Sequence, residues 1–165
     1  TSSTAAAWQS LSLLTTAFSI VYKSSDESRA STTIVAADSA LSFSTTTNTK
    51  YYIILNILGA VTSTSPDFKY TITHSQAINY SALTISYFEG TTQLNADSAI
   101  ASNSSTICTT KTMNTAVGNF WLRFEGIIDV ATGGTFNFNW SQNASNVNPT
   151  VVIRGSSLMY AIANI

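Results

Sequence analysis

Hydrophobic and polar residues alternate along much of the chain, which is the pattern of a β-strand with one buried face. The alternation is clearest over Phe18–Tyr22, Phe68–His74 and Phe136–Trp140. Turn-forming residues separate such segments about every ten residues, and no stretch after the first sixteen residues has helical spacing. The pattern predicts an all-β, antiparallel β-sandwich or barrel of about eight to ten strands.

The segment Tyr51–Leu58 departs from simple alternation because both of its faces are apolar. A strand that is apolar on both faces is normally covered on both faces. We therefore expect either a central sandwich strand beneath a second layer or a strand that contacts another subunit. The two faces consist of Tyr51, Ile53, Leu55 and Ile57 on one side, and Tyr52, Ile54 and Leu58 on the other.

Three further segments set the expected organisation. The glycine pair in Thr132–Gly134 predicts a hairpin turn between strands over residues 119–130 and 135–142. Residues 95–115 are small and polar and predict no definite element. The Ala- and Ser-rich residues 1–16 are interpreted as an N-terminal arm that holds a short helix or an added strand, ahead of a single β domain over residues 17–165.

Charged side chains are scarce: they make up 9% of the 165 residues, against about 25% in typical globular proteins. The net charge is -1, and the seven Lys and Arg residues are scattered along the chain. Binding to nucleic acid or to an anionic membrane requires clusters of basic residues. No run approaches the roughly 18 apolar residues of a transmembrane helix. This composition argues against binding to nucleic acid or to a membrane, and it favours an extracellular or particle-bound protein.

Few residues offer chemistry. His74, the only histidine, continues the apolar face of its strand and is interpreted as a hydrogen-bonded or rim histidine. Cys108 is alone, so it can form no intrachain disulfide and is interpreted as a small buried residue. Glu125 and Asp129 share a strand parity, but Arg123 is expected to form an ion pair with Glu125. We predict no catalytic residue, no metal site and no cofactor, and therefore a structural or adhesive protein.

Two aromatic residues, Trp121 and Tyr51, are candidates for exposure on strand faces. Exposed aromatic side chains bind sugars, and they are also enriched at subunit interfaces. Tyr51 lies among aliphatic residues such as Ile53 and Leu55 rather than among polar groups that would bond a sugar. The pattern favours a subunit interface.

Several short segments follow one another along the chain in a characteristic order and spacing. They are Val21–Ser28, Ser31–Thr33, Asp38–Phe43, Asn48–Tyr52, Pro66–Tyr70, Gly134–Asn143 and Thr150–Leu158. Over about residues 18–165 they resemble a module of tailed-bacteriophage structural proteins. Such modules are compact jelly rolls, similar to tumour-necrosis-factor and complement globular-head domains, and they usually form trimers. The resemblance implies a jelly-roll fold, a virion component and no catalytic residues.

In such a trimer one sheet of each subunit faces the threefold axis, which would cover the second apolar face of the segment Tyr51–Leu58. The interface predicted on this basis comprises Tyr51, Ile53, Leu55, Ile57, Trp121, Met159 and Tyr160.

The function implied is that of a homotrimeric capsid decoration (cement) protein on the virion surface, whose partner is the major capsid protein or another virion protein. The arm is expected to dock on the shell or on a neighbouring subunit. The alternative is a receptor-binding tip of a tail fibre or spike that recognises host glycans through an outer loop. A secreted sugar-binding module is a third hypothesis. The residues concerned are Trp8, Leu11, Leu13 and Leu14 of the arm, and Asn143, Asn146 and Asn148 of the loop.

Overall fold

A computed structural model describes residues 18–63, 66–89, 92–113, 115 and 117–163. The described residues form ten strands and no helix, which confirms the all-β antiparallel prediction. The predicted arm, residues 1–16, lies outside the described residues. The strands are β1 (Ser19–Tyr22), β2 (Glu27–Arg29), β3 (Ala36–Thr45), β4 (Thr49–Val61), β5 (Phe68–Glu89), β6 (Thr92–Met113), β7 (Gly118–Val130), β8 (Gly134–Ser141), β9 (Thr150–Val152) and β10 (Ser157–Ile162).

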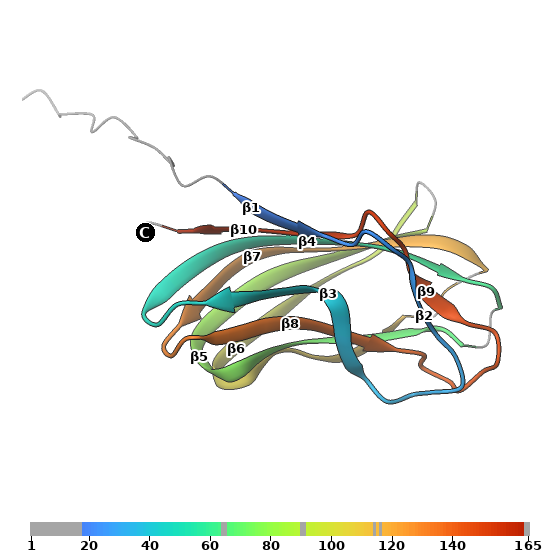
Figure 1. The fold of residues 1–165 in the computed structure, drawn as a ribbon, viewed down its shortest axis with the longest axis horizontal. Helices are drawn as coiled ribbons and strands as arrows, with labels where there is room; N and C mark the ends of the chain where they lie inside the picture. The colour runs from blue at the N-terminus through green and yellow to red at the C-terminus, as the bar shows by residue number, and fades with distance from the viewer. Residues whose placement is uncertain (1–17, 64–65, 90–91, 114, 116, 164–165) are drawn as a thin grey trace, which may run out of the picture.

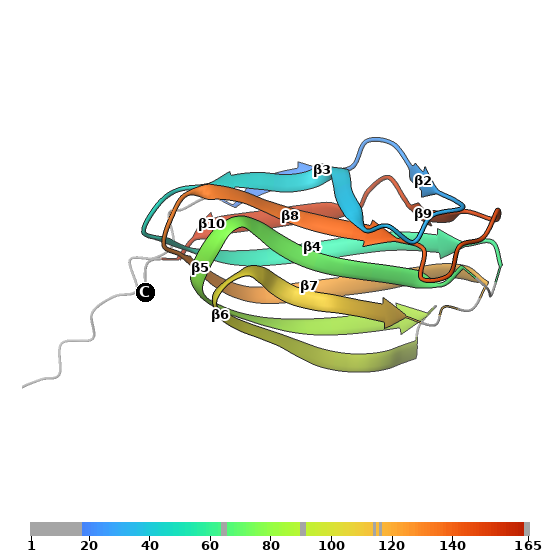
Figure 2. The same ribbon diagram turned by 90° about the horizontal axis from the view of Figure 1, so that it is seen from below.

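The strands form two layers that share the long strands β5 and β6 (Figures 1 and 2). The first, here the β4 layer, has the order β1-β10-β4-β7 and continues into the second half of β5. The second, the β8 layer, has the order β3-β8 and continues into the first half of β5. The chain alternates between the layers from β3 through β4 and β5 to β7, β8 and β10. Short β2 and β9 pair beside the end of β4.

Both β5 and β6 bend in the middle and change layer. Residues 69–74 of β5 pair with β8, and residues 80–89 pair with β7. Strand β6 follows β5 through the bend, with register shifts around residues 73–78 and 104–106. Residues 95–115, which predicted no definite element, therefore lie mostly in a strand. Their small polar side chains obscure its two-residue period.

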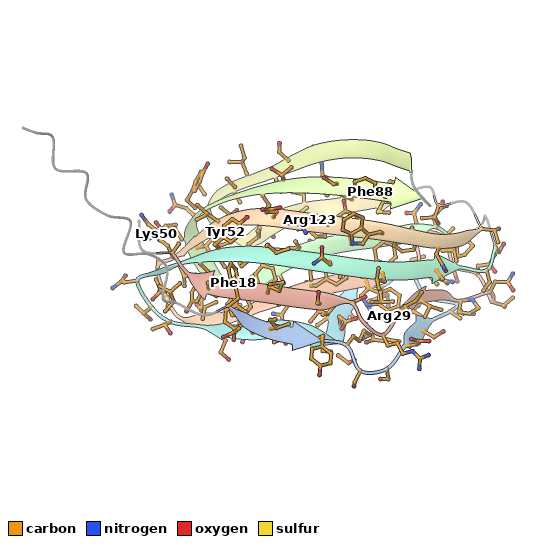
Figure 3. The ribbon with its side chains drawn as sticks, turned by 90° about the horizontal axis from the view of Figure 1, so that it is seen from above. Phe18, Arg29, Lys50, Tyr52, Phe88 and Arg123 are labelled. Atoms are coloured by element: carbon orange, nitrogen blue, oxygen red, sulfur yellow. The ribbon has the colours of Figure 1, made fainter. Side chains whose placement is uncertain are left out.

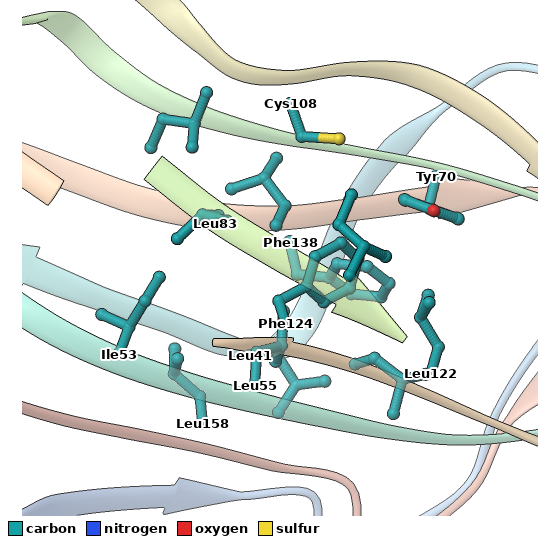
Figure 4. Close-up of a cluster of buried hydrophobic side chains, with 14 of the residues drawn as sticks. Leu41, Ile53, Leu55, Tyr70, Leu83, Cys108, Leu122, Phe124, Phe138 and Leu158 are labelled. Atoms are coloured by element: carbon teal, nitrogen blue, oxygen red, sulfur yellow. The ribbon is translucent and has the colours of Figure 1, made fainter. Parts of the chain in front are cut away.

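The core lies between the layers and is filled by side chains from every long strand (Figure 4). Trp140, Phe124 and Phe138 are fully buried there. The structure corrects the predicted interface at β4, because it places that face inside the subunit, where it cannot contact a second copy. The residues moved from interface to core are Tyr51 (4% exposed), Ile53, Leu55 and Ile57 (each 0% exposed).

The predicted hairpin at Thr132–Gly134 is also wrong. The turn exists, but β7 pairs with β4 and β5, whereas β8 pairs with β3 and β5. The glycine pair therefore carries the chain from one layer to the other. A turn sequence indicates where the chain reverses, but long-range packing selects the partner of each strand.

A buried ion pair fixes the segment between β1 and β3. The ammonium group of Lys23 donates hydrogen bonds to both carboxylate oxygens of Asp38, at 2.8 and 2.9 Å. The indole N–H of Trp140 donates to the same carboxylate at 3.0 Å. Glu27 accepts a further bond from Lys23 at 2.7 Å. Because Trp140 belongs to β8, this cluster ties the first strands to the β8 layer.

Candidate functional site

The outer face of the β4 layer carries an uncovered set of large apolar side chains (Figure 3). It follows from strand register: Ile20 pairs with Met159, Met159 with Ile54, and Ile54 with Glu125 of β7. Directly paired residues share a face of the sheet. We call this side of the β4 layer the outer face. Its large apolar residues are Phe18, Ile20, Tyr22, Tyr52, Ile54, Leu58, Phe88, Trp121, Ile127 and Met159.

The β1 edge of the outer face is the most exposed. Ile20 is 56% exposed and Tyr22 is 66% exposed. Phe18 is 37% exposed, and its ring contacts that of Tyr52 edge-on, with centroids 6.2 Å apart. Toward the other end of β4, Leu58 is 38% exposed. Contiguous exposed apolar side chains on a soluble domain mark interaction surfaces.

The opposite edge of the outer face is built by aromatic stacking. The rings of Phe88 and Trp121 stack with centroids 4.8 Å apart and an interplanar angle of 30°. These residues pair directly across β5 and β7. Trp121 therefore lies half-buried on the outward side of the sheet, and the aromatic residue beside it is Phe88 rather than Tyr51.

The polar groups at the centre of the outer face bond to one another. Arg123 and Glu125 form an ion pair at 2.6 Å, which confirms the predicted pairing. Arg123 also donates to the side-chain oxygen of Asn56 at 3.2 Å, and the Tyr52 hydroxyl donates to Glu125. Burial and this bond raise the pKa of Tyr52 to about 12. The same bond, together with Arg123, lowers the pKa of Glu125.

Charges on the outer face balance. Besides Arg123 and Glu125, Lys50 and Asp129 lie 4.0 Å apart across β4 and β7. A hollow of about 260 Å³ is lined by Arg123 and Glu125 with two small β5 residues, Thr84 and Ser86. A face with no net charge and internally bonded polar groups can contact an apolar partner without leaving a charge unpaired.

The two predicted interface residues on β10 lie on opposite faces. Met159 is half-buried on the outer face, next to Ile54. Tyr160 points toward the core, where its ring stacks on Phe43 with centroids 3.9 Å apart. Of the seven predicted interface residues, only Trp121 and Met159 are on the outer face. The missed residues Phe18, Ile20 and Phe88 follow from the register of β1 and β5, which sequence pattern alone does not define.

The predicted outer loop is held by its own side chains. The amide N–H of Asn148 donates to the side-chain oxygen of Asn146 at 2.8 Å. The side-chain oxygen of Gln142 accepts a hydrogen bond from the backbone N–H of Asn146, and the side-chain N–H of Gln142 donates to the backbone carbonyl of Asn148. The backbone N–H of Asn143 donates to the carbonyl of Pro66. At least one of the three predicted glycan-binding amides, that of Asn146, therefore already has a structural partner.

The other candidate residues occupy structural positions. His74 is 2% exposed, its Nε2 lies 2.7 Å from the Thr45 hydroxyl, and its Nδ1 lies 2.8 Å from the carbonyl of Gln76. Cys108 is fully buried, and burial raises the pKa of its thiol to about 11. Both residues match their sequence interpretations. The described ranges contain no cluster of three His, Cys, Asp or Glu suited to a metal ion.

Within the part of the chain that the structure describes, no helix has the length and apolar character needed to cross a membrane.

Comparisons with known proteins give no family. No protein-family model matches the chain, and no curated protein matches it. Among solved structures, a chain of infectious bursal disease virus Gt strain aligns with 7% identity and a TM-score of 0.24. A chain of the Gx strain gives 11% and 0.29, and the VP2 subviral particle of this virus gives 10% and 0.28.

The alignments cover 90%, 90% and 88% of this chain but only 42%, 42% and 39% of the viral chains. This chain therefore spans less than half the length of each viral chain. TM-scores this low do not establish a shared fold.

Proposed function

We propose that this chain is a non-enzymatic structural subunit of a virion, acting as a homotrimeric capsid decoration protein whose copies contact one another through the outer face. The observation that carries the proposal is the set of exposed and half-buried apolar side chains on the β4 layer, from Phe18 and Ile20 to Leu58 and Trp121. The assignment to a virion rests on the resemblance of the sequence segments between Val21 and Leu158 to the phage module.

Two properties of the outer face support a second copy as its partner. Its four charged residues sum to zero, so two identical faces do not repel each other. Its aromatic side chains at both edges, Phe18 and Tyr22 at one and Phe88 and Trp121 at the other, are of the type enriched in interface cores. A stable interface of ordinary size buries about 800 Å² on each partner, and five neighbouring strands provide a surface of that order.

The oligomeric state tests this proposal directly. Light scattering on the full chain should give three times the chain mass, and the double variant Ile20→Lys, Leu58→Lys should give the monomer mass. Both residues are exposed, so the substitutions leave the core intact. The matched control is Ile34→Lys, at a residue that is 78% exposed in the β2–β3 loop, and it should remain trimeric. A monomeric wild-type chain at micromolar concentration would overturn the trimer.

Attachment to the shell is tested separately. We expect deletion of residues 1–16, which contain Trp8 and Leu11, to abolish binding to capsids while the trimer persists. Binding retained after the deletion would contradict the role of the arm. Copy number then distinguishes a decoration protein, present in hundreds of copies per particle, from the alternative fibre or spike tip, present in a few to tens. A cryo-EM map of the particle would show which applies.

A further inference from the structure

One edge of strand β6 forms no backbone ladder with another described strand. Within the described strands β6 pairs with β5 alone, along its whole length. Residues 92–102 belong to the β4 layer and residues 106–113 to the β8 layer, because β5 changes layer beside them. Figure 2 shows β6 running to the bend and back. The outward edge of β6 therefore has no partner among the described strands of either layer.

The two halves of β6 enclose a groove. Asp97 in the first half and Lys111 in the second form an ion pair at 2.7 Å, so the halves approach closely at this point. The groove has a volume of about 320 Å³. Its lining includes every residue from Ser98 to Ser102. Because successive strand residues point to opposite faces, a continuous lining means that the backbone edge itself forms this wall.

The second wall and the floor complete the groove. Thr106 and Thr109 line it from the other half of β6, and the buried side chains of Ala99 and Ile107 also contribute. Apart from Ile100 and Ile107, the lining side chains are Ser, Thr, Ala and the paired Lys111. This lining provides backbone donors and acceptors but little depth for a large side chain.

We propose that this groove binds residues 1–7 of the chain, Thr-Ser-Ser-Thr-Ala-Ala-Ala, as an added β-strand that pairs with the free edge of β6. An unpaired strand edge binds extended peptide through main-chain hydrogen bonds. The shallow lining selects small side chains, and the Asp97–Lys111 pair leaves no net charge to attract a charged segment. Residues 1–7 are uncharged and contain only Thr, Ser and Ala.

Chain length permits this occupancy. The proposed bound segment, residues 1–7, is joined to Phe18 by residues 8–17, and ten extended residues reach about 35 Å. Strand β1 lies five strand spacings from β6 in the sheet order, which is about 24 Å. The occupant can therefore be the arm of the same copy or that of a neighbour, and the inference holds in either case. It does not depend on the virion assignment, since Trp8 to Leu14, the part proposed to dock on the shell, lies beyond the bound segment.

Hydrogen exchange of backbone amides tests the inference on the full chain. The variant Ser3→Pro, Thr4→Pro, Ala6→Pro, Ala7→Pro removes N–H donors from both alternating sets of the arm, so ladder hydrogen bonds are lost whichever set faces β6. We expect amides within residues 98–109 to exchange roughly fivefold faster than in the wild type, the change that corresponds to the loss of about one hydrogen bond. Amides of β8 serve as the internal control and should not change. Equal exchange of residues 98–109 in the two proteins would overturn the proposal.

Disulfide trapping provides a second, independent measurement. The variant Ala5→Cys, Ala101→Cys should form the new disulfide under mild oxidation, because Ala101 lines the groove. The control Ala5→Cys, Val147→Cys places the second thiol on an exposed loop residue away from the groove and should not. A cross-link between copies, seen as a covalent dimer or trimer, indicates a neighbour's arm, and an internal cross-link indicates the copy's own arm. Equal yields in the two variants would refute the site whatever the trimer experiment shows.

Discussion

Replacing Asp38 by Ala is the most informative perturbation of stability, because this carboxylate is the centre of the buried cluster. Its side chain is 0% exposed and that of Lys23 is 2% exposed. It accepts two bonds from Lys23 and one from the indole of Trp140. It also accepts the amide N–H groups of Ala40 and Leu41 at 3.0 and 3.1 Å. The substitution leaves all these donors without this acceptor.

The magnitude follows from the burial of both partners. Removing one member of a buried ion pair costs about 3–5 kcal/mol, because the other charge stays buried. Glu27 remains 2.7 Å from Lys23 and compensates in part, which places the expected loss near the lower limit, at about 3 kcal/mol. For a urea slope of about 2 kcal/mol per molar, the unfolding midpoint should fall by about 1.5 M.

Urea denaturation followed by tryptophan fluorescence and by circular dichroism, at one protein concentration, measures this loss. The matched control is Asp97→Ala, which removes an ion pair of similar length, 2.7 Å, whose side chains are 36% and 47% exposed. Exposed pairs contribute less than about 1 kcal/mol. If Asp38→Ala cost no more than Asp97→Ala, burial would not be the source of the stability and the reasoning would fail.

Three further predictions concern single sites. Burial alone raises the pKa of the Glu27 carboxyl, but hydrogen bonds, the strongest from Lys23, lower it to about 2, below its ordinary 4.5. The stability gained from this lower pKa is complete above pH 4.5 and is lost as the pH falls toward 2. In Glu27→Gln, the free energy of unfolding measured across this interval should therefore depend less on pH than in the wild type. Gly126→Ala should lower the free energy of unfolding by about 2–3 kcal/mol, because a Cβ would lie 2.0 Å from a β5 carbonyl oxygen. The control Gly118→Ala, also at positive φ but with nothing within 4 Å, should lower the melting temperature less when both variants are unfolded by heat. Cys108, with its pKa raised to about 11 by burial, should react with a thiol reagent only after unfolding, and rapid reaction of the native chain would show that β6 opens.

The fold class and the inward faces of the alternating strands were determined by local pattern. A two-residue period over Phe68–His74 and Phe136–Trp140 identifies strands and their inward faces wherever they pair, because side chains alternate across any sheet. His74 and the Arg123–Glu125 pair were interpreted correctly for the same reason, since strand parity and near neighbours decide their surroundings. Cys108 was interpreted correctly from residue type, because an unpaired cysteine is most often a small buried residue.

Tertiary structure decided which residues meet. The period of β4 showed two apolar faces, but only the layer across the core determined that Ile53 lies inside and Ile54 outside. The bend of β5 and β6, the layer change at Gly133 and the register that brings Phe18 beside Tyr52 all depend on partners far away in sequence. Strand pattern is a local property of the chain, whereas strand partnership depends on how the whole apolar surface is buried, and this is why the outer face and the β6 groove could be found only in the folded molecule.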